Sequence, residues 1–234
     1  MLTTVDEVDG ERVLTIRLSG ATVDVDTVEA LGAALADAAP DGAENVVLRF
    51  DGDGDGDAVT GDFPSWPAGP GRSDMRYFSR WDETLSRLSR LEAKTFAAFD
   101  GRVGAAAVQI GLVTDLRLAS TRARLSLGSL PEGRFPGMGA YWLPKFVGLG
   151  NARRMFLLGE DLTATHAARL GLLDVVDESV EAAVGATIKA LRPVTPEAAC
   201  FTRRVLDDCY LLERGAAAEL AKAARYKVGM PHGD

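Results

Sequence analysis

The sequence predicts an α/β fold, because segments of strand length alternate along the chain with segments of helical periodicity. Residues 13–18 (VLTIRL) alternate apolar and polar side chains as a strand does. Residues 24–39 place valine and leucine at helical spacing, and residues 45–50 (NVVLRF) return as a strand. We therefore expect the chain to open with a strand–helix–strand crossover, a unit that is right-handed in nearly all sheets.

Residues 94–150 contain a third strand, which leads into a helix start made of small residues. Residues 95–99 (TFAAF) form an apolar run that ends in the turn pair Asp100-Gly101. Residues 104–107 (GAAA) then open a mostly apolar helix whose first turn has almost no side-chain bulk. The free N–H groups of such a turn suit an anion or a developing negative charge. The same residues would equally let the helix pack closely on the sheet, since alanine is the best helix former.

Two further helical segments are predicted, and one of them has a clear apolar face. Residues 196–228 have a helical pattern. Residues 75–91 carry aromatic and leucine side chains at helical spacing, which we interpret as a core stripe made of Phe78, Trp81, Leu85 and Leu88.

Composition limits the possible partners and locations. The chain has 234 residues, 47% of them hydrophobic, which is enough for one sizeable core. Its net charge of −8 argues against nucleic acid or an anionic membrane as the main partner. No segment approaches the ~18 apolar residues of a membrane span, and the N-terminus lacks the pattern of a signal peptide. We therefore expect a cytoplasmic protein.

The acidic stretch 51–57 (DGDGDGD) matches half of a calcium-binding loop. The twelfth position of that loop is Asp62, where calcium loops normally use a bidentate glutamate, and the preceding segment is predicted as a strand instead of a helix. We favour the alternative that glycine and aspartate form a solvated turn where the strand ends. No metal is expected in the functional site.

Six features between residues 100 and 176 follow one another in an order that resembles the crotonase (enoyl-CoA hydratase/isomerase) superfamily. They are Asp100-Gly101, the small-residue helix start, Asp115-x-Arg117-x-Ala119, Pro136-Gly137-x-Gly139, Val147-Gly148-x-x-x-Ala152 and residues 164–176 (ATHAARLGLLDVV). The resemblance implies a crotonase-like spiral of ββα repeats over residues 1–192. It also implies a shortened C-terminal helical segment, residues 193–234, and assembly as a homotrimer or hexamer.

The same resemblance implies an acyl thioester as substrate, carried by CoA or by a carrier protein, with no separate cofactor. Two backbone N–H groups would form an oxyanion hole, and they map to Asp62 and Ala106. Such donors stabilise the charge that develops on the thioester oxygen when the carbonyl is attacked or the α-carbon loses a proton. The substrate pocket would be lined by Gly61, Phe63, Gly137, Tyr141 and Trp142.

Hydratases of this superfamily use two glutamates, and counting without gaps from Asp115 places their positions at Gln109 and Ser129. Neither side chain is an ordinary acid or base. Glu132 would replace the second glutamate if the loop register shifts. These three residues are the candidates for catalysis, although Gln109 could instead be a buried polar group and Ser129 a turn residue.

Two functions are consistent with these features. The first is an enoyl-CoA hydratase/isomerase-like lyase or isomerase with an atypical active site. The alternative is a non-catalytic accessory subunit that binds a partner enzyme of a polyketide-type biosynthetic pathway. The short length, the missing glutamates and the alanine-rich helix start resemble the small crotonase-like proteins of antibiotic and polyketide pathways, such as the DpgB type.

Overall fold

The computed structural model describes residues 1–8, 10–38, 42–52, 59–63, 72–128 and 138–209. The strands in this part of the chain are β1 (Leu2–Val8), β2 (Glu11–Leu18), β3 (Asn45–Asp51), β4 (Lys94–Asp100), β5 (Arg102–Val103), β6 (Leu116–Ser120), β7 (Arg124–Leu125), β8 (Leu162–Thr163) and β9 (Val175–Asp177). The helices are α1 (Val25–Ala38), α2 (Arg72–Ser89), α3 (Ala105–Gly111), α4 (Gly139–Leu158), α5 (Ala164–Arg169), α6 (Val180–Leu191) and α7 (Pro196–Cys209). The alternation of strands and helices confirms the predicted α/β class.

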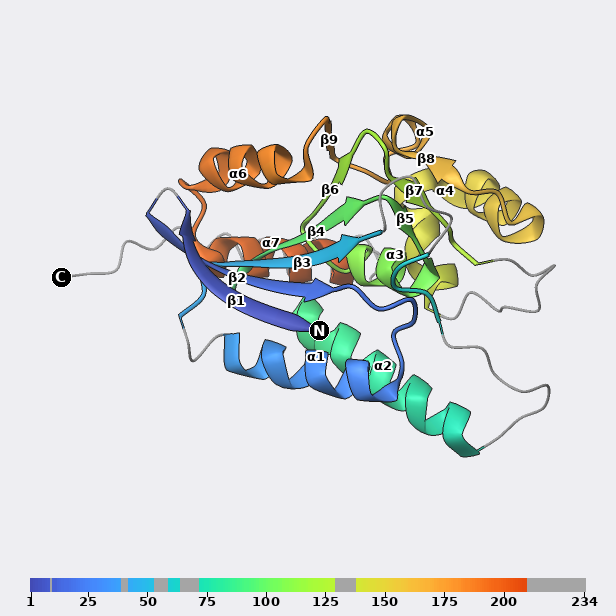
Figure 1. The fold of residues 1–234 in the computed structure, drawn as a ribbon, viewed down its shortest axis with the longest axis horizontal. Coiled ribbons are helices and arrows are strands. Elements are labelled where there is room, and N and C mark those ends of the chain that lie inside the picture. The colour runs from blue at the N-terminus through green and yellow to red at the C-terminus, as the bar shows by residue number, and fades with distance from the viewer. Residues whose placement is uncertain (9, 39–41, 53–58, 64–71, 129–137, 210–234) are drawn as a thin grey trace.

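The larger sheet has six strands in the order β1-β2-β3-β4-β6-β9 and runs through the middle of the molecule (Figure 1). Its strands pair in parallel from β2 to β9, whereas β1 pairs antiparallel with β2 at one edge. The register aligns Val13 with Asn45 and Asn45 with Lys94, so the amino ends of β2, β3 and β4 lie in one row. A smaller sheet contains β5, β7 and β8.

The edge strand β1 was not predicted from the sequence. All of its residues except Val8 are exposed, so no face of the strand selects for apolar side chains, and the alternation that identifies a half-buried strand is missing. A turn joins β1 to β2, and Gly10 adopts a φ of 83° there, which glycine does without a steric penalty.

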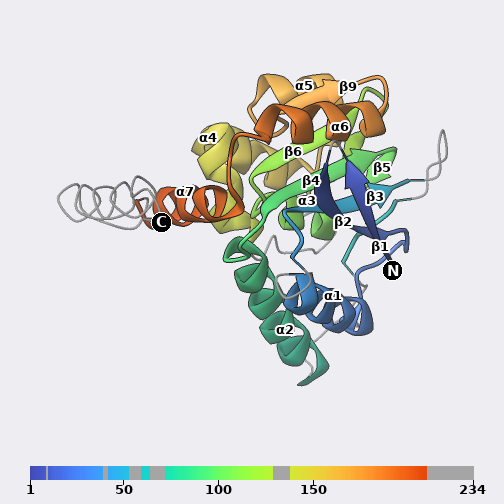
Figure 2. The ribbon, with the colours of Figure 1, turned by 90° about the vertical axis from the view of Figure 1, so that its left-hand side faces the viewer.

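Helices cover both faces of the larger sheet, with α1 and α2 side by side on one face and α6 on the other (Figure 2). Side chains alternate between the two faces along each strand, so each strand contributes to two separate clusters. Ile16, Leu48 and Phe99 belong to the cluster that includes residues of α1, α2 and α3. The second cluster joins the opposite face to α6 and contains Val13, Val47, Phe96, Ala98, Leu118, Val180, Ala183 and Ile188.

The predicted core stripe of α2 is correct except for its first residue. Trp81, Leu85 and Leu88 are buried, but Phe78 is 40% exposed. Tyr77 takes the interior position, and its hydroxyl donates a hydrogen bond of 2.7 Å to the carbonyl of Val23. Burial raises the pKa of this hydroxyl. Phe78 precedes Trp81 by three residues and Tyr77 precedes it by four, and both spacings place a side chain on the same helix face. The sequence pattern therefore did not show which of the two is buried.

The acidic stretch begins at the end of a strand, as expected. Asp51 is the last residue of β3, and its carboxylate lies 3.1 Å from Arg17 and 2.6 Å from Arg49. Residues 53–58 lie outside the described part of the chain. Within the described ranges, no group of three or more histidine, cysteine, aspartate or glutamate side chains is arranged to hold a metal ion. None of the helices in those ranges is long and apolar enough to cross a membrane.

A buried arginine attaches α7 to the amino ends of the central strands. Arg203 is 7% exposed, and its guanidinium donates hydrogen bonds of 2.6 Å to the Asp115 carboxylate and 2.9 Å to the Thr95 hydroxyl. It also donates to the carbonyl oxygens of Ser89 and Leu91. The guanidinium therefore joins α7 to the end of α2, to β4 and to the turn before β6.

We expect Arg203→Met to lower the free energy of unfolding by about 3 kcal/mol, because the substitution leaves a partly buried carboxylate without its cation. Urea denaturation followed by circular dichroism measures the change. Arg204→Met is the matched control, since Arg204 is exposed on the same helix and its loss should change stability by less than about 0.5 kcal/mol. Equal losses in the two variants would contradict the anchoring role of Arg203.

Candidate functional site

The first turn of α3 is hydrogen-bonded to the segment that follows β3. The N–H of Gly104 donates to the carbonyl of Thr60 at 2.8 Å, and the N–H of Ala107 donates to the carbonyl of Gly61 at 2.7 Å. Gly104 is the N-cap of α3 and has an extended backbone, without a side chain to cap the helix. The predicted helix start is thus joined by its backbone to residues 60–63.

This close approach requires glycine on both sides. A Cβ atom on Gly104 would lie 2.5 Å from the Cβ of Asp62, and one on Gly61 would lie 2.8 Å from the Cβ of Ala107. Gly61 also has a φ of 72°, which other residues rarely adopt. At the other end of α3, a Cβ on Gly111 would lie 2.7 Å from a ring carbon of Phe99 in β4. Close packing therefore explains the small residues at both ends of the helix.

Asp62 uses both its backbone and its carboxylate at this junction. Its N–H donates to the carbonyl of Ala21 at 2.9 Å, and its carbonyl accepts from the N–H of Val23 at 2.8 Å. The carboxylate oxygen Oδ1 accepts from the N–H of Phe63 at 2.8 Å and from the N–H of Ala105 at 3.3 Å. The amide predicted to serve an oxyanion hole is thus bonded to Ala21 in this structure, and a carboxylate lies at the start of α3.

Ala106 and Gln109 both lie in the interior beside this junction. Ala106 has no exposed surface, and Gln109 is 4% exposed. A Cβ atom on Gly139 would lie 3.1 Å from the side-chain nitrogen of Gln109, so the amide rests against the first residue of α4. The structure therefore brings Gln109 next to the second glycine of the predicted Pro136-Gly137-x-Gly139 elbow.

The structure also describes three of the predicted pocket residues, Phe63, Tyr141 and Trp142. Phe63 packs edge-to-face against Trp81 at a centroid distance of 5.2 Å. Tyr141 and Trp142 contact each other at 4.9 Å in the first turn of α4. The ammonium group of Lys145 lies 3.9 Å and 4.0 Å from the centroids of these two rings. Three of the predicted residues lie outside the described ranges, namely Ser129, Glu132 and Gly137.

A family model for enoyl-CoA hydratase/isomerase matches residues 19–206, which is well over half of the chain. The chain belongs to the enoyl-CoA hydratase/isomerase family. A curated relative in this family, an enoyl-CoA-hydratase of Amycolatopsis orientalis, is 28% identical over 149 residues. That match covers 63% of this chain and 69% of the relative.

Solved structures establish the crotonase fold for this family member. An enoyl-CoA hydratase from Bacillus anthracis has a TM-score of 0.84 and 20% identity, with 98% of this chain and 92% of that chain covered. A Thermobifida fusca protein assigned as an enoyl-CoA hydratase, solved in complex with CoA, has a TM-score of 0.78 and 23% identity. That match covers 96% of this chain and 91% of the other. The predicted crotonase-like fold is confirmed.

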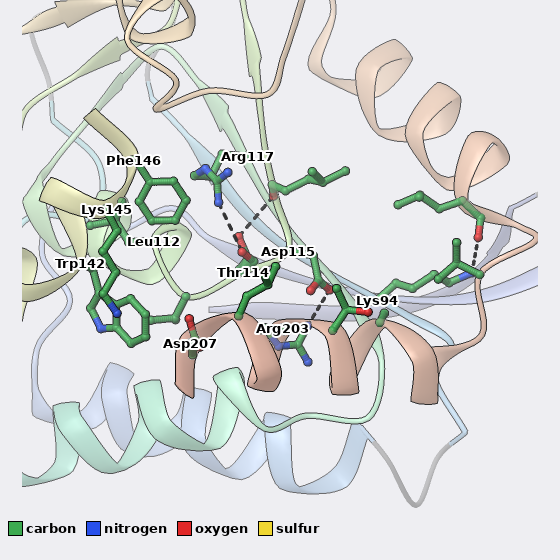
Figure 3. Close-up of a pocket in the computed structure, with 17 residues that line it drawn as sticks. Lys94, Leu112, Thr114, Asp115, Arg117, Trp142, Lys145, Phe146, Arg203 and Asp207 are labelled. Atoms are coloured by element: carbon green, nitrogen blue, oxygen red, sulfur yellow. Dashed lines mark hydrogen bonds and ion pairs between the residues drawn. The ribbon is translucent and has the colours of Figure 1, made fainter. Parts of the chain in front are cut away.

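In this enoyl-CoA hydratase/isomerase family member, a cavity of about 600 Å³ lies at the C-terminal end of α3 (Figure 3). Its walls come from the turn after α3, from α4, and from α7 with the residues before it. Of the predicted pocket residues that the structure describes, Trp142 alone lines this cavity. Trp142 and Phe146 share one face of α4, but periodicity does not show which helix a face meets. The sequence therefore gave no sign that α7 closes the cavity.

Arg117, from the Asp115-x-Arg117-x-Ala119 motif, forms part of the cavity wall. Its guanidinium lies 2.6 Å from the Asp174 carboxylate and donates to the carbonyl of Leu172 at 2.9 Å. The guanidinium carbon also lies 4.3 Å from the centroid of the Phe146 ring. Burial lowers the pKa of Arg117, and the nearby carboxylates of Asp174 and Asp115 oppose this effect. Arg117 therefore has a structural role that orders α4 against β6.

A second ion pair fixes the turn at the carboxyl end of β4. The carboxylate of Asp100 accepts hydrogen bonds from Arg122 at 2.7 Å and from the Ser120 hydroxyl at 2.5 Å. The hydrogen bond from Arg122 lowers the pKa of Asp100, and this effect together with that of Ser120 outweighs the opposing effect of burial.

Asp100→Asn should destabilise the fold at pH 7, and the difference from the natural protein should shrink in acid. The folded-state pKa of Asp100 is lowered, so its carboxylate stabilises the fold above the ordinary aspartate pKa of about 3.9 and loses this effect as the pH falls toward the lowered value. Urea denaturation between about pH 7 and pH 3 measures the trend. Asp37→Asn, at an exposed position of α1, is the control. A difference that is constant with pH would contradict the assignment.

Gly104→Ala should lower the free energy of unfolding by about 1–3 kcal/mol, because the new methyl group overlaps Asp62. Gly185→Ala is the matched control. Gly185 lies inside α6 and has open space where the methyl group would go, so this substitution should raise stability by up to about 1 kcal/mol. Thermal unfolding compares the two variants, and a shift of the same sign in both would contradict the close approach at Gly104.

Proposed function

We propose that this protein binds an acyl thioester, carried by CoA or by a carrier protein, at the junction between residues 60–63 and α3. The observation that supports the proposal is the contact of residues 60–62 with Gly104, Ala105 and Ala107, the residues on either side of the predicted donor Ala106. The Thermobifida fusca structure, which was solved in complex with CoA, supports the CoA part of such a ligand for this fold.

The chemistry at this junction would be stabilisation of a thioester oxyanion or enolate. The N–H of Ala106 in the first turn of α3 would be one donor. The N–H of Asp62 would be the second, and to act it must exchange its bond to Ala21 for a bond to the thioester oxygen. Gln109 does not titrate, so it would orient a water molecule or a carbonyl without transferring a proton. We therefore propose a lyase or isomerase reaction different from hydration by two glutamates, with Ser129 and Glu132 as the remaining candidates for proton transfer.

A second candidate function is that of a non-catalytic accessory subunit. The observation that favours it is the Asp62 carboxylate, which already accepts from Ala105 and Phe63 and places a negative charge where the reaction would develop another. The second half of α4 also exposes large apolar side chains that a partner enzyme or a second copy of the chain would cover. They are Leu149, Leu157 and Leu158, each 55–59% exposed.

Calorimetric titration with CoA, acetyl-CoA, malonyl-CoA and a longer enoyl-CoA, followed by mass analysis of each mixture, separates the two candidates. Micromolar binding together with a changed acyl mass would establish a thioester enzyme and identify its reaction. The absence of binding by every thioester would favour the accessory subunit.

Asp62→Asn should strengthen the binding of acyl-CoA by roughly tenfold, because it removes a negative charge close to the thioester oxygen. The asparagine oxygen can still accept from Phe63 and Ala105, so the local fold should persist. Binding of CoA without an acyl group should not change, since free CoA has no thioester oxygen. Asp26→Asn, at an exposed position of α1, is the control for a general effect of charge. An equal gain for CoA and acyl-CoA would place the effect of Asp62 away from the thioester.

A further inference from the structure

Asp207 is a half-buried carboxyl group that lines the cavity between α4 and α7. It lies on α7, on the side of this helix that faces Trp142 and Lys145 of α4 (Figure 3). Burial raises the pKa of Asp207, although the positive charges of Lys145 and Arg203 oppose this effect. Its carboxyl group is therefore partly withdrawn from water at a concave surface.

The cationic side chains around this cavity are already engaged. Lys94 bonds to Glu11 at 2.8 Å, Arg117 to Asp174 at 2.6 Å and Arg203 to Asp115 at 2.6 Å. Lys145 lies over the rings of Tyr141 and Trp142. Among the charged residues of the cavity wall, Asp207 alone makes no hydrogen bond, ion pair or cation–π contact with the part of the chain that the structure describes.

We propose that this cavity binds a small amine whose apolar body lies among Trp142, Phe146 and Leu206 and whose ammonium group pairs with Asp207. The volume of about 600 Å³ is in the range of cavities that hold small organic ligands. The walls that would contact the apolar body also include Leu112 and Val194. A half-buried carboxylate and an ammonium group form a hydrogen-bonded ion pair that is stronger than a neutral hydrogen bond.

The chemistry of the wall favours an amine over other ligand classes. A neutral ligand would leave the Asp207 charge without a partner, which disfavours burying it further. A carboxylate ligand would face Asp207 directly, and the guanidinium groups of Arg117 and Arg203 are already committed to other acceptors. The ammonium group of a ligand therefore complements Asp207, the one charged group of the wall for which the described part of the chain provides no hydrogen bond or ion pair, although Lys145 and Arg203 act on it at longer range.

This site is separate from the proposed thioester site and does not depend on it. Asp62 and Gly104 mark the N-terminal end of α3, whereas Leu112 and Thr114 lie beyond its C-terminal end and line the cavity. A failure of thioester binding would leave the amine proposal intact, and the reverse also holds.

Calorimetric titration of the full chain with three probes of similar size tests the proposal. The probes are 2-phenylethylamine, 2-phenylethanol and 3-phenylpropanoate, which differ in the charge of the polar end. We expect the amine to bind and the alcohol and the carboxylate to bind at least about tenfold more weakly. This comparison uses the natural protein, so it does not rely on a variant that folds. Equal binding of all three probes, tighter binding of the carboxylate, or no binding of the amine would overturn the proposal.

Two variants then test whether Asp207 is the residue that pairs with the amine. Asp207→Asn should weaken binding of 2-phenylethylamine by roughly tenfold or more. Asp208→Asn removes a neighbouring exposed charge from the same helix and should leave the affinity within about twofold, since Asp208 does not line the cavity. Circular dichroism confirms that both variants are folded. Equal weakening in both variants would show a general effect of charge and would overturn the assignment to Asp207.

Discussion

Three buried cations form ion pairs at the amino ends of the parallel strands of the larger sheet. They are Lys94, Arg117 and Arg203, each at most 7% exposed. Each pairs with a carboxylate from a distant part of the chain. A buried charge without a partner is costly, so these pairs fix β2, the turn before β6 and α7 relative to one another. For Glu11, burial alone would raise the carboxyl pKa, but the hydrogen bonds from Lys94 and Asn45 outweigh it and lower the pKa. These ion pairs therefore set the relative positions of the elements that meet at the amino ends of the parallel strands.

In the described part of the chain, the N-terminal end of α3 is held by backbone contacts and not by ion pairs. Backbone groups of residues 60–63 meet backbone groups of the first helical turn, and only glycine fits at Gly61 and Gly104. Contacts between backbone groups do not depend on the identity of the side chains, so this junction restricts its residues mainly through the space that only glycine leaves. The two ends of one short helix therefore differ in chemistry, with main-chain amides at one and charged side chains at the other.

Periodicity was sufficient to predict the elements that have one buried face, such as β2, α1, β3 and the stripe of α2. It was insufficient where burial imposes no pattern, as in the exposed strand β1, or where two spacings are equivalent, as for Tyr77 and Phe78. The family resemblance implied that Asp62 lies near the start of α3, and the contacts of Asp62 with Gly104 and Ala105 agree with this. It did not predict that the Asp62 amide would bond to Ala21, because that contact depends on a loop without any sequence signal. Asp207 was missed for a related reason, since α4 and α7 are distant in sequence.

The anchoring of α7 by Arg203 also has a mechanical consequence. Cys200 and Arg203 are the buried residues of this helix, and Leu206, one turn further along, is 59% exposed. A segment with few buried apolar contacts is displaced at a low cost in free energy. Because α7 forms one wall of the cavity, we expect the part of this wall beyond Arg203 to be displaced more easily than the part that the guanidinium holds.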